Sequence, residues 1–403
     1  MAVSEQRRGT LWVVLAAATL TVMAGAIIGP VVRQIQLGVG VSESLAGLII
    51  TTHGILIVVV SPVAGAVIDR VGPRRPFLLG LVLYGLGGGA GLLVESFGPL
   101  LLSRVVLGIG VAFVYTAVTV LIFTLYEGQR MDRALGLRSS ANSLGAAVWP
   151  LLGGALGTLS WQAPFGVYLV ALPLGAVAVL TIPETGHGGR SRGDGDGADF
   201  LDAVRELLAV FRRTPGILAV YLLYFGANLL LYVIVVYYPQ LLATLGVTST
   251  LWVGLYLAVN GAAGGVSAAL YDRLVARAGR LPLVLVAFAL WIGGFAAAVV
   301  VETPLAAGVP VILFGLGLGL VFPSAFAWIE ALAPADRQGS LSSYVASAGY
   351  LGQFASPLAF GLVLAPFGIR GVFLAAAAAA GLALVLTVLA VGTRGTSARE
   401  QAT

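Results

Sequence analysis

The chain has 403 residues, of which 59% are hydrophobic and only 10% are charged, with a formal net charge of +5. Soluble domains carry about a quarter charged residues, so this composition, with a mean hydropathy of +1.01, excludes an ordinary soluble protein. Cysteine is absent, which excludes disulfides, thiolate metal sites and cysteine nucleophiles. The length leaves room for about twelve spanning helices of about 20 residues each, so we expect an all-α membrane protein.

Twelve apolar segments follow one another along the chain and predict the membrane spans. They cover residues 11–32, 44–68, 76–94, 99–125, 134–158 and 164–182, then 215–242, 249–271, 281–301, 305–331, 338–365 and 369–391. The polar stretch in the middle begins as a glycine-rich, charged linker, and residues 199–213 have the apolar face of a helix that lies on a membrane surface. We therefore expect an N-terminal bundle at 1–182, a cytoplasmic linker at 183–214 and a C-terminal bundle at 215–403.

The 22 basic side chains are all arginines, and their distribution predicts the orientation of the spans. If the N-terminus lies in the cytoplasm, all but three of them fall on cytoplasmic segments, and the exceptions are Arg33, Arg104 and Arg370. Basic residues concentrate in cytoplasmic loops, so we expect a multi-pass protein of the cell membrane with both termini in the cytoplasm. The positive net charge then reflects membrane orientation and does not indicate nucleic acid binding.

The turn after the second predicted span carries the most informative motif, Gly65-Ala-Val-Ile-Asp69-Arg70-Val-Gly72-Pro-Arg74-Arg75. An ordinary basic turn would explain the arginines but not Gly, Asp, Arg and Gly at these spacings. The motif resembles the signature loop of the major facilitator superfamily of transporters. The resemblance implies two six-helix bundles related by a pseudo-twofold axis along the membrane normal, and the pair Asp69-Arg70 has a counterpart, Asp272-Arg273, in the second half.

The resemblance also implies a role for this turn in conformational switching. The residues concerned are Gly65, Asp69, Arg70, Gly72, Arg74, Arg75, Asp272 and Arg273. We expect Gly65 to let a neighbouring helix approach closely. Asp69 is expected to accept hydrogen bonds from a helix N-terminus or to pair with a basic residue.

Two further motifs lie in the fourth and fifth predicted spans. The segment Arg104-Val-Val-Leu-Gly108-Ile-Gly110 is similar to the Arg-x-x-x-Gly-x-Gly helix of the same superfamily. The segment Gly145-Ala-Ala-Val-Trp149-Pro150-Leu-Leu-Gly153-Gly154 resembles an element associated with antiporters, although Trp149 stands where glycine is usual. The resemblance implies that Gly145, Pro150 and Gly154 form a bent, closely packed interface between the two halves, and it favours an exporter.

Arg104 and His53 are the ionisable groups that lie well inside predicted spans. A permanent cation in the bilayer needs partners, and backbone carbonyls, polar side chains or an anionic substrate would each serve for Arg104. A structural role and a direct role in substrate binding or proton coupling are therefore both open for this residue. His53 is the candidate for carrying protons, because no span interior contains a carboxylate and histidine titrates near neutral pH. A neutral, hydrogen-bonded packing histidine is the competing interpretation.

Aromatic and amide side chains on the cavity-lining helices of this family are the remaining candidates for a substrate site, because polar groups within spans tend to face the interior. They are Tyr115, Asn142, Trp149, Tyr224, Asn228, Tyr232, Asn260, Trp328, Tyr350 and Gln353. Such a set suits an amphiphilic or aromatic solute. Each residue taken singly also fits a role in helix packing.

The sequence contains no P-loop and no histidine or carboxylate cluster, so we expect neither an enzyme nor a bound metal or cofactor. The preferred hypothesis is a monomeric secondary active transporter that works by alternating access and exports drug-like or amphiphilic metabolites in exchange for protons. The alternative is uptake or exchange of a small organic anion bound by Arg104. A non-transporting receptor on the same fold would be expected to carry a signalling domain, and none is recognisable.

Overall fold

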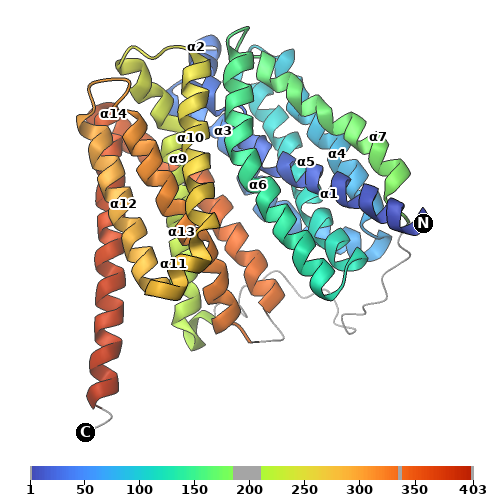
Figure 1. The fold of residues 1–403 in the computed structure, drawn as a ribbon. Coiled ribbons are helices and arrows are strands. Elements are labelled where there is room, and N and C mark those ends of the chain that lie inside the picture. The colour runs from blue at the N-terminus through green and yellow to red at the C-terminus, as the bar shows by residue number, and fades with distance from the viewer. Residues whose placement is uncertain (1, 185–209, 335–337, 401–403) are drawn as a thin grey trace.

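The computed structural model describes residues 2–184, 210–334 and 338–400, and these are folded into helices joined by short turns (Figure 1). In the first half the helices are α1 (Ala2–Ala26), η1 (Gly29–Val31), α2 (Val32–Val39), α3 (Glu43–Val71), α4 (Arg74–Gly89), η2 (Ala90–Leu92), α5 (Phe97–Leu125), α6 (Gly128–Gly157), η3 (Ala163–Val170) and α7 (Ala171–Thr181). In the second half they are α9 (Pro215–Thr244), α10 (Thr250–Ala269), α11 (Tyr271–Ala278), α12 (Arg280–Val300), α13 (Gly308–Leu332) and α14 (Gln338–Glu400).

Ten helices within the described residues are long and apolar enough to cross a bilayer. One of them, residues 344–389, contains two spans, because Gly368 has a φ of 66° and interrupts the helical backbone of α14. α6 is 30 residues long but less apolar, since Ser139, Ser140 and Asn142 dilute its hydropathy. With that division and with α6, the described helices supply the twelve predicted spans.

The helix ends extend the predicted spans by a few residues, and two elements differ from expectation. The first span continues beyond α1 into η1 and α2, and the sixth begins as the 3₁₀ helix η3 before α7. The predicted surface helix at 199–213 lies outside the described residues, apart from its last turn at 210–213.

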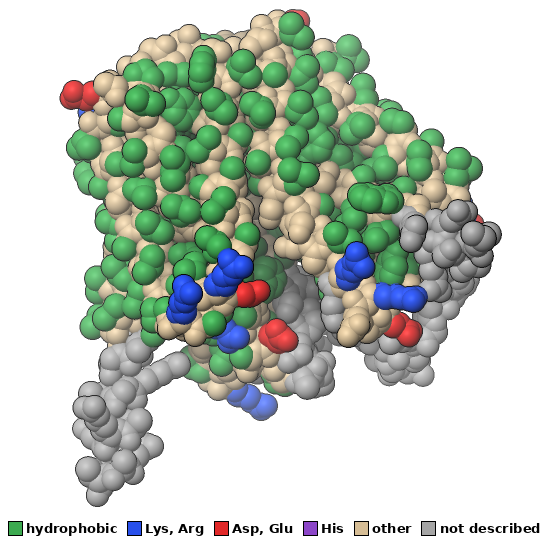
Figure 2. Space-filling model, in the orientation of Figure 1, with side chains coloured by type: hydrophobic (Ala, Val, Ile, Leu, Met, Phe, Trp, Pro, Cys, Tyr) green, Lys and Arg blue, Asp and Glu red, His purple; other side chains and the backbone are tan. Residues whose placement is uncertain are grey.

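The helices form two groups, with α1 to α7 on one side and α9 to α14 on the other (Figure 1). We call residues 2–184 the N-half and residues 210–400 the C-half. Arginine side chains gather at one end of the molecule, which we call the arginine-rich end, where α3 ends and where α4 and α6 begin (Figure 2). Figure 2 also shows a hollow between the halves that opens at this end and does not reach the opposite one.

The halves touch at the opposite end, which we call the closed end, through α6 on α10 and α3 on α14. A Cβ added to Gly154 would overlap the Thr250 carbonyl and come within 3.0 Å of the Gly254 Cα. A Cβ on Gly47 would lie 2.7 Å from Pro357. Small residues permit such close backbone approach where lipid supplies no hydrophobic force between helices. The closed end is therefore a glycine-mediated contact, and the structure is open toward the arginine-rich end.

Candidate functional site

Aromatic rings from both halves meet in the middle of the molecule. Tyr115 of α5 and Tyr350 of α14 pack edge to face, with ring centroids 6.0 Å apart. Tyr224 of α9 packs on Phe322 of α13 at 5.0 Å and edge-on to Phe326 at 5.6 Å. Edge-to-face pairs at these distances are favourable, so the rings form a defined wall shared between the halves.

An amide pair lies beside these rings. Gln353 donates from Nε2 to Asn228 Oδ1 at 3.0 Å, and Asn228 donates from Nδ2 to the Tyr224 carbonyl at 2.9 Å. Gly349 leaves room for this arrangement, since a Cβ there would lie 2.6 Å from Tyr224. Gln353 Oε1 has no hydrogen-bond partner among the described residues. A buried amide oxygen without a partner is costly, and this atom is enclosed by its neighbours in the present conformation.

Arg138 is the residue that the sequence analysis missed. The arginine count assigns it to the cytoplasmic segments, yet its guanidinium lies 5.3 Å from the centroid of the Tyr115 ring and donates to Thr119 Oγ1 at 2.9 Å. Two signals in the sequence could have identified it. The predicted fifth span begins at residue 134, which places Arg138 inside it, and Asn142 follows four residues later on the same helical face.

The residues of this central cluster lie at a similar depth, although they belong to four different helices. At a rise of 1.5 Å per residue, Tyr115, Arg138, Tyr224 and Tyr350 lie about 14 to 18 Å from the ends of their helices at the arginine-rich end. Beyond them the halves come together, since a Cβ on Gly54 would be 3.2 Å from the Tyr350 carbonyl and one on Gly261 would be 2.7 Å from the Ala146 carbonyl. The cluster therefore lies where the hollow ends.

Arg104 lies inside the N-half and is completely buried. Its Nη2 donates to the carbonyls of Gly88 at 2.8 Å and Gly87 at 3.3 Å, which lie in the buried last turn of α4. The guanidinium also lies 4.8 Å from the Phe165 ring and 5.1 Å from the Tyr168 ring. A cation at a helix C-terminus satisfies carbonyls that have no partner in the helix and is favoured by the helix dipole. These contacts support the structural interpretation of Arg104, and its binding of substrate stays a prediction.

The other glycines of this motif allow α5 to pack tightly on its neighbours. A Cβ on Gly108 would lie 2.6 Å from the Leu56 side chain and 3.0 Å from the His53 Cα of α3. A Cβ on Gly110 would lie 2.5 Å from the Tyr84 amide of α4. Arg104, Gly108 and Gly110 therefore join α3, α4 and α5 into one unit.

His53 lies at the boundary between the halves. It is 2% exposed, and its Nδ1 is 2.7 Å from the Ile50 carbonyl. A Cβ on Gly25 of α1 would come within 3.0 Å of the His53 ring and 2.7 Å of the hydroxyl of Tyr232, which belongs to the C-half. The predicted site residues His53 and Tyr232 thus approach the same point on α1 from different halves.

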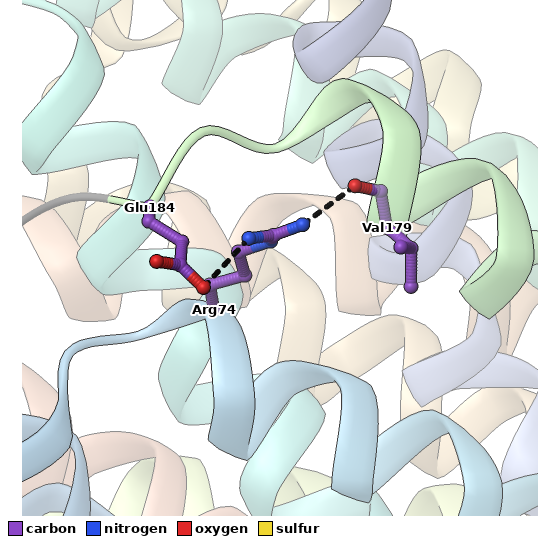
Figure 3. Close-up of polar contacts among 3 residues, drawn as sticks. All are labelled: Arg74, Val179 and Glu184. Atoms are coloured by element: carbon purple, nitrogen blue, oxygen red, sulfur yellow. Dashed lines mark hydrogen bonds and ion pairs between the residues drawn. The ribbon is translucent and has the colours of Figure 1, made fainter.

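The signature turn is fixed by Arg74 (Figure 3). Arg74 Nη1 pairs with Glu184 Oε1 at 3.0 Å, and Nη2 donates to the Val179 carbonyl at 2.6 Å. These contacts hold the start of α4 against the end of α7. Gly72, with a φ of 80°, ends α3 in a conformation that favours glycine. Asp69, Arg70, Arg75, Asp272 and Arg273 are exposed at the arginine-rich end.

The expected close approach at Gly65 is absent from this conformation. A Cβ added to Gly65 would find no atom within 4 Å. The reason is that the halves are apart at the arginine-rich end, where Gly65 lies, and meet from the central cluster to the closed end. No side-chain hydrogen bond or ion pair of Asp69 occurs among the described contacts, and its role in switching stays a prediction.

The remaining predicted residues lie at several places. Trp149 donates its indole N–H to the Thr19 carbonyl at 3.1 Å and covers Gly145, so it packs within the N-half against α1. Pro150 and Gly154 face α10, where a Cβ on Gly254 would lie 2.5 Å from the Pro150 carbonyl. Trp328 packs against a small apolar cluster of α9, α13 and α14. Asn142 Oδ1 and Asn260 Oδ1 are buried without a partner among the described residues.

Comparison with known proteins identifies the family. The model of the Major Facilitator Superfamily matches residues 14–357. The chain belongs to this superfamily, and it is a membrane transporter and not an enzyme. Solved transporters confirm the fold. A bacterial homologue of the human lysosomal transporter Spinster, inward-facing and occupied, matches with a TM-score of 0.77 at 16% identity over 95% of this chain and 96% of that one. A D-xylose–proton symporter matches with a TM-score of 0.78 at 17% identity over 94% and 96%.

Relatives found by sequence carry names of two kinds, a regulatory protein and exporters. The Transcription regulatory protein OpdE of Pseudomonas aeruginosa is 29% identical, and the match covers 87% of this chain and 85% of that protein. The Multidrug efflux protein YfmO of Bacillus subtilis is 29% identical over 42% of each chain. The Bacillibactin exporter of Bacillus subtilis is 29% identical over 34% of this chain and 36% of that one. The matches to these two exporters thus span less than half of either protein.

Proposed function

We propose that this transporter exports small amphiphilic organic solutes in exchange for protons. The observation that carries the proposal is the cluster of rings and amides where the hollow ends, because Tyr115, Tyr350 and Tyr224 supply aromatic rings and Gln353 supplies an amide beside them. Ligand pockets typically combine apolar walls with a few placed polar groups. The positive-inside bias supports a cytoplasmic orientation of the arginine-rich end, and in that orientation this conformation would take solute from the cytoplasm.

The direction of transport is supported by two features. Several relatives are named as exporters or multidrug efflux proteins, and Gly154 of the antiporter-like element packs directly on the C-half at the closed end. The alternative of anion uptake or exchange at Arg104 has less support, because Arg104 is enclosed within the N-half by Gly87, Gly88 and aromatic rings.

A regulatory membrane protein is the second candidate, favoured by the near full-length match to a relative that carries a regulatory name. The two functions predict different results in a flux assay. Liposomes that contain the purified protein are loaded with one of three probes of similar shape, 2-naphthoate, 2-naphthamide or 2-naphthylmethylammonium. Dilution into more acidic buffer should accelerate release of at least one probe beyond that from protein-free liposomes, and a protonophore should remove the acceleration. A regulatory protein would release each probe at the protein-free rate.

We expect His53→Gln to abolish the proton dependence of transport while leaving binding of the probe intact. Glutamine approximates the size and hydrogen bonding of histidine but does not titrate. The charged and titratable groups nearest His53 are Arg104 on α5 and Tyr232 on α9, and neither exchanges protons at ordinary pH. The measurement compares probe release with and without a pH gradient in the two proteins. Unchanged acceleration by the gradient in His53→Gln would assign coupling to another group.

A further inference from the structure

The charge at the end of the hollow has a consequence for the choice of solute. Arg138 is half-buried on α6, at the same depth as Tyr115 and Tyr350. Its guanidinium is permanently ionised, and a cation at such depth normally has an anionic or carbonyl partner. Among the described residues, Arg138 contacts the Thr119 hydroxyl and the Tyr115 ring. The ion pair formed within that part of the chain joins Arg74 to Glu184 and does not involve Arg138.

The geometry leaves much of the guanidinium available. Arginine has five N–H donors in a planar fork, which fits a carboxylate through two parallel hydrogen bonds. Among the described residues, Nη1 is the nitrogen that donates, to Thr119, and Thr119 itself donates to the Tyr115 carbonyl at 3.1 Å, which fixes the position of the acceptor. The Tyr115 ring lies 5.3 Å from the guanidinium carbon and forms no hydrogen bond with its N–H groups, so donors remain for a ligand.

Aromatic rings from the C-half complete the site. Tyr350 packs on Tyr115 and is close enough to Arg138 to interact with it electrostatically. An aromatic carboxylate could therefore pair with Arg138 of the N-half and pack on Tyr115 and Tyr350, one ring from each half.

From this arrangement we infer that Arg138 is the specificity-determining residue of the central site and that it selects aromatic organic anions. The inference rests on the proposed function for the direction of movement but concerns the binding site alone. It assigns the anion to Arg138, which borders the hollow, and leaves Arg104 as a structural cation of the N-half.

The test measures binding separately from transport. Binding of 2-naphthoate, 2-naphthamide and 2-naphthylmethylammonium to the purified full chain is followed by quenching of intrinsic fluorescence and by thermal shift. Wild type should bind the acid at least about tenfold more tightly than the amide or the amine, and Arg138→Gln should weaken acid binding by about tenfold to a hundredfold, as for loss of a charged hydrogen bond. Amide binding should be unchanged.

Two further variants separate the effect of the Arg138 side chain from general effects of charge. Arg138→Lys keeps the charge without the fork and should show intermediate affinity for the acid. Arg133→Gln removes an exposed arginine from the same helix and should bind all three probes like wild type. If Arg138→Gln fails to yield folded protein, the Arg138→Lys and Arg133→Gln pair decides the question.

The outcomes separate this inference from the proposed function. Tightest binding of the amine or amide by wild type, or an acid preference that survives in Arg138→Gln, would overturn the inference even if proton-driven export is observed. Binding of the acid that depends on Arg138, without movement of any probe in liposomes, would support the inference and contradict export.

Discussion

Gly154→Leu is expected to reduce transport to below about a tenth of the wild-type rate while leaving the protein folded. The leucine side chain would have to occupy space already filled by Thr250 and Gly254 of α10, because even a Cβ overlaps the Thr250 carbonyl. Interfaces of this kind depend on small residues, and a rocking transporter must re-form the closed end in every cycle. The change affects the contact between halves more than the packing within either half, so yield and elution in detergent should stay near wild type.

The matched control is Gly136→Leu in the same helix, where an added Cβ meets no atom within 4 Å. This variant should transport at close to the wild-type rate. Wild-type flux in Gly154→Leu would show that the contact of α6 with α10 is not required for the cycle.

Arg104→Leu is expected to cause the largest loss of stability among single substitutions of charged residues. It leaves the carbonyls of Gly87 and Gly88 without their donor and removes the packing of the guanidinium on Phe165 and Tyr168. Loss of charged hydrogen bonds and creation of a cavity each cost about 2 kcal/mol or more. The expected result is a melting temperature in detergent lower by at least several degrees.

Two comparisons make this prediction specific. Arg104→Lys keeps the charge but not the planar fork, so it should fall between wild type and Arg104→Leu. Arg277→Leu, at an exposed position on α11, should melt within about a degree of wild type, since exposed substitutions rarely change stability by more than about 0.5 kcal/mol. If Arg104→Leu melts like wild type but no longer binds 2-naphthoate, Arg104 acts in binding and not in the packing of α4.

Most of the fold could be predicted from the sequence because its determinants are local. The length of each apolar segment predicts a span, and Gly368 separates the last two spans. The positions of the arginines predict the orientation of the helices. The close contact at Gly154 was also predictable, since a glycine pair beside Pro150 in a span is typical of tight helix packing. The open space at Gly65 was not, because it depends on which end of the transporter is closed in this conformation.

The site was predicted less completely, for a physical reason. The sequence names polar and aromatic residues in spans but not the direction in which each side chain points. Tyr115, Tyr350, Asn228 and Gln353 meet at the centre, whereas Trp149 turns back to α1 within its own half. Arg138 was missed because an arginine near the start of a span is normally a cytoplasmic anchor. Its position over Tyr115 depends on how α6 is rotated against α5.

Transport is expected to require opening of the closed end, and a disulfide across that contact should therefore prevent it. The protein contains no native cysteine, so Ser44→Cys and Gly361→Cys would provide its only thiols. A Cβ at Gly361 would lie 2.8 Å from the Ser44 Cβ, and a shift of about 1 Å brings the pair to disulfide spacing. The flux of whichever naphthalene probe wild type carries fastest is then measured with the pair oxidised and reduced. Oxidation should stop transport and reductant should restore it. Transport at the wild-type rate with the disulfide intact would show that the closed end does not need to open.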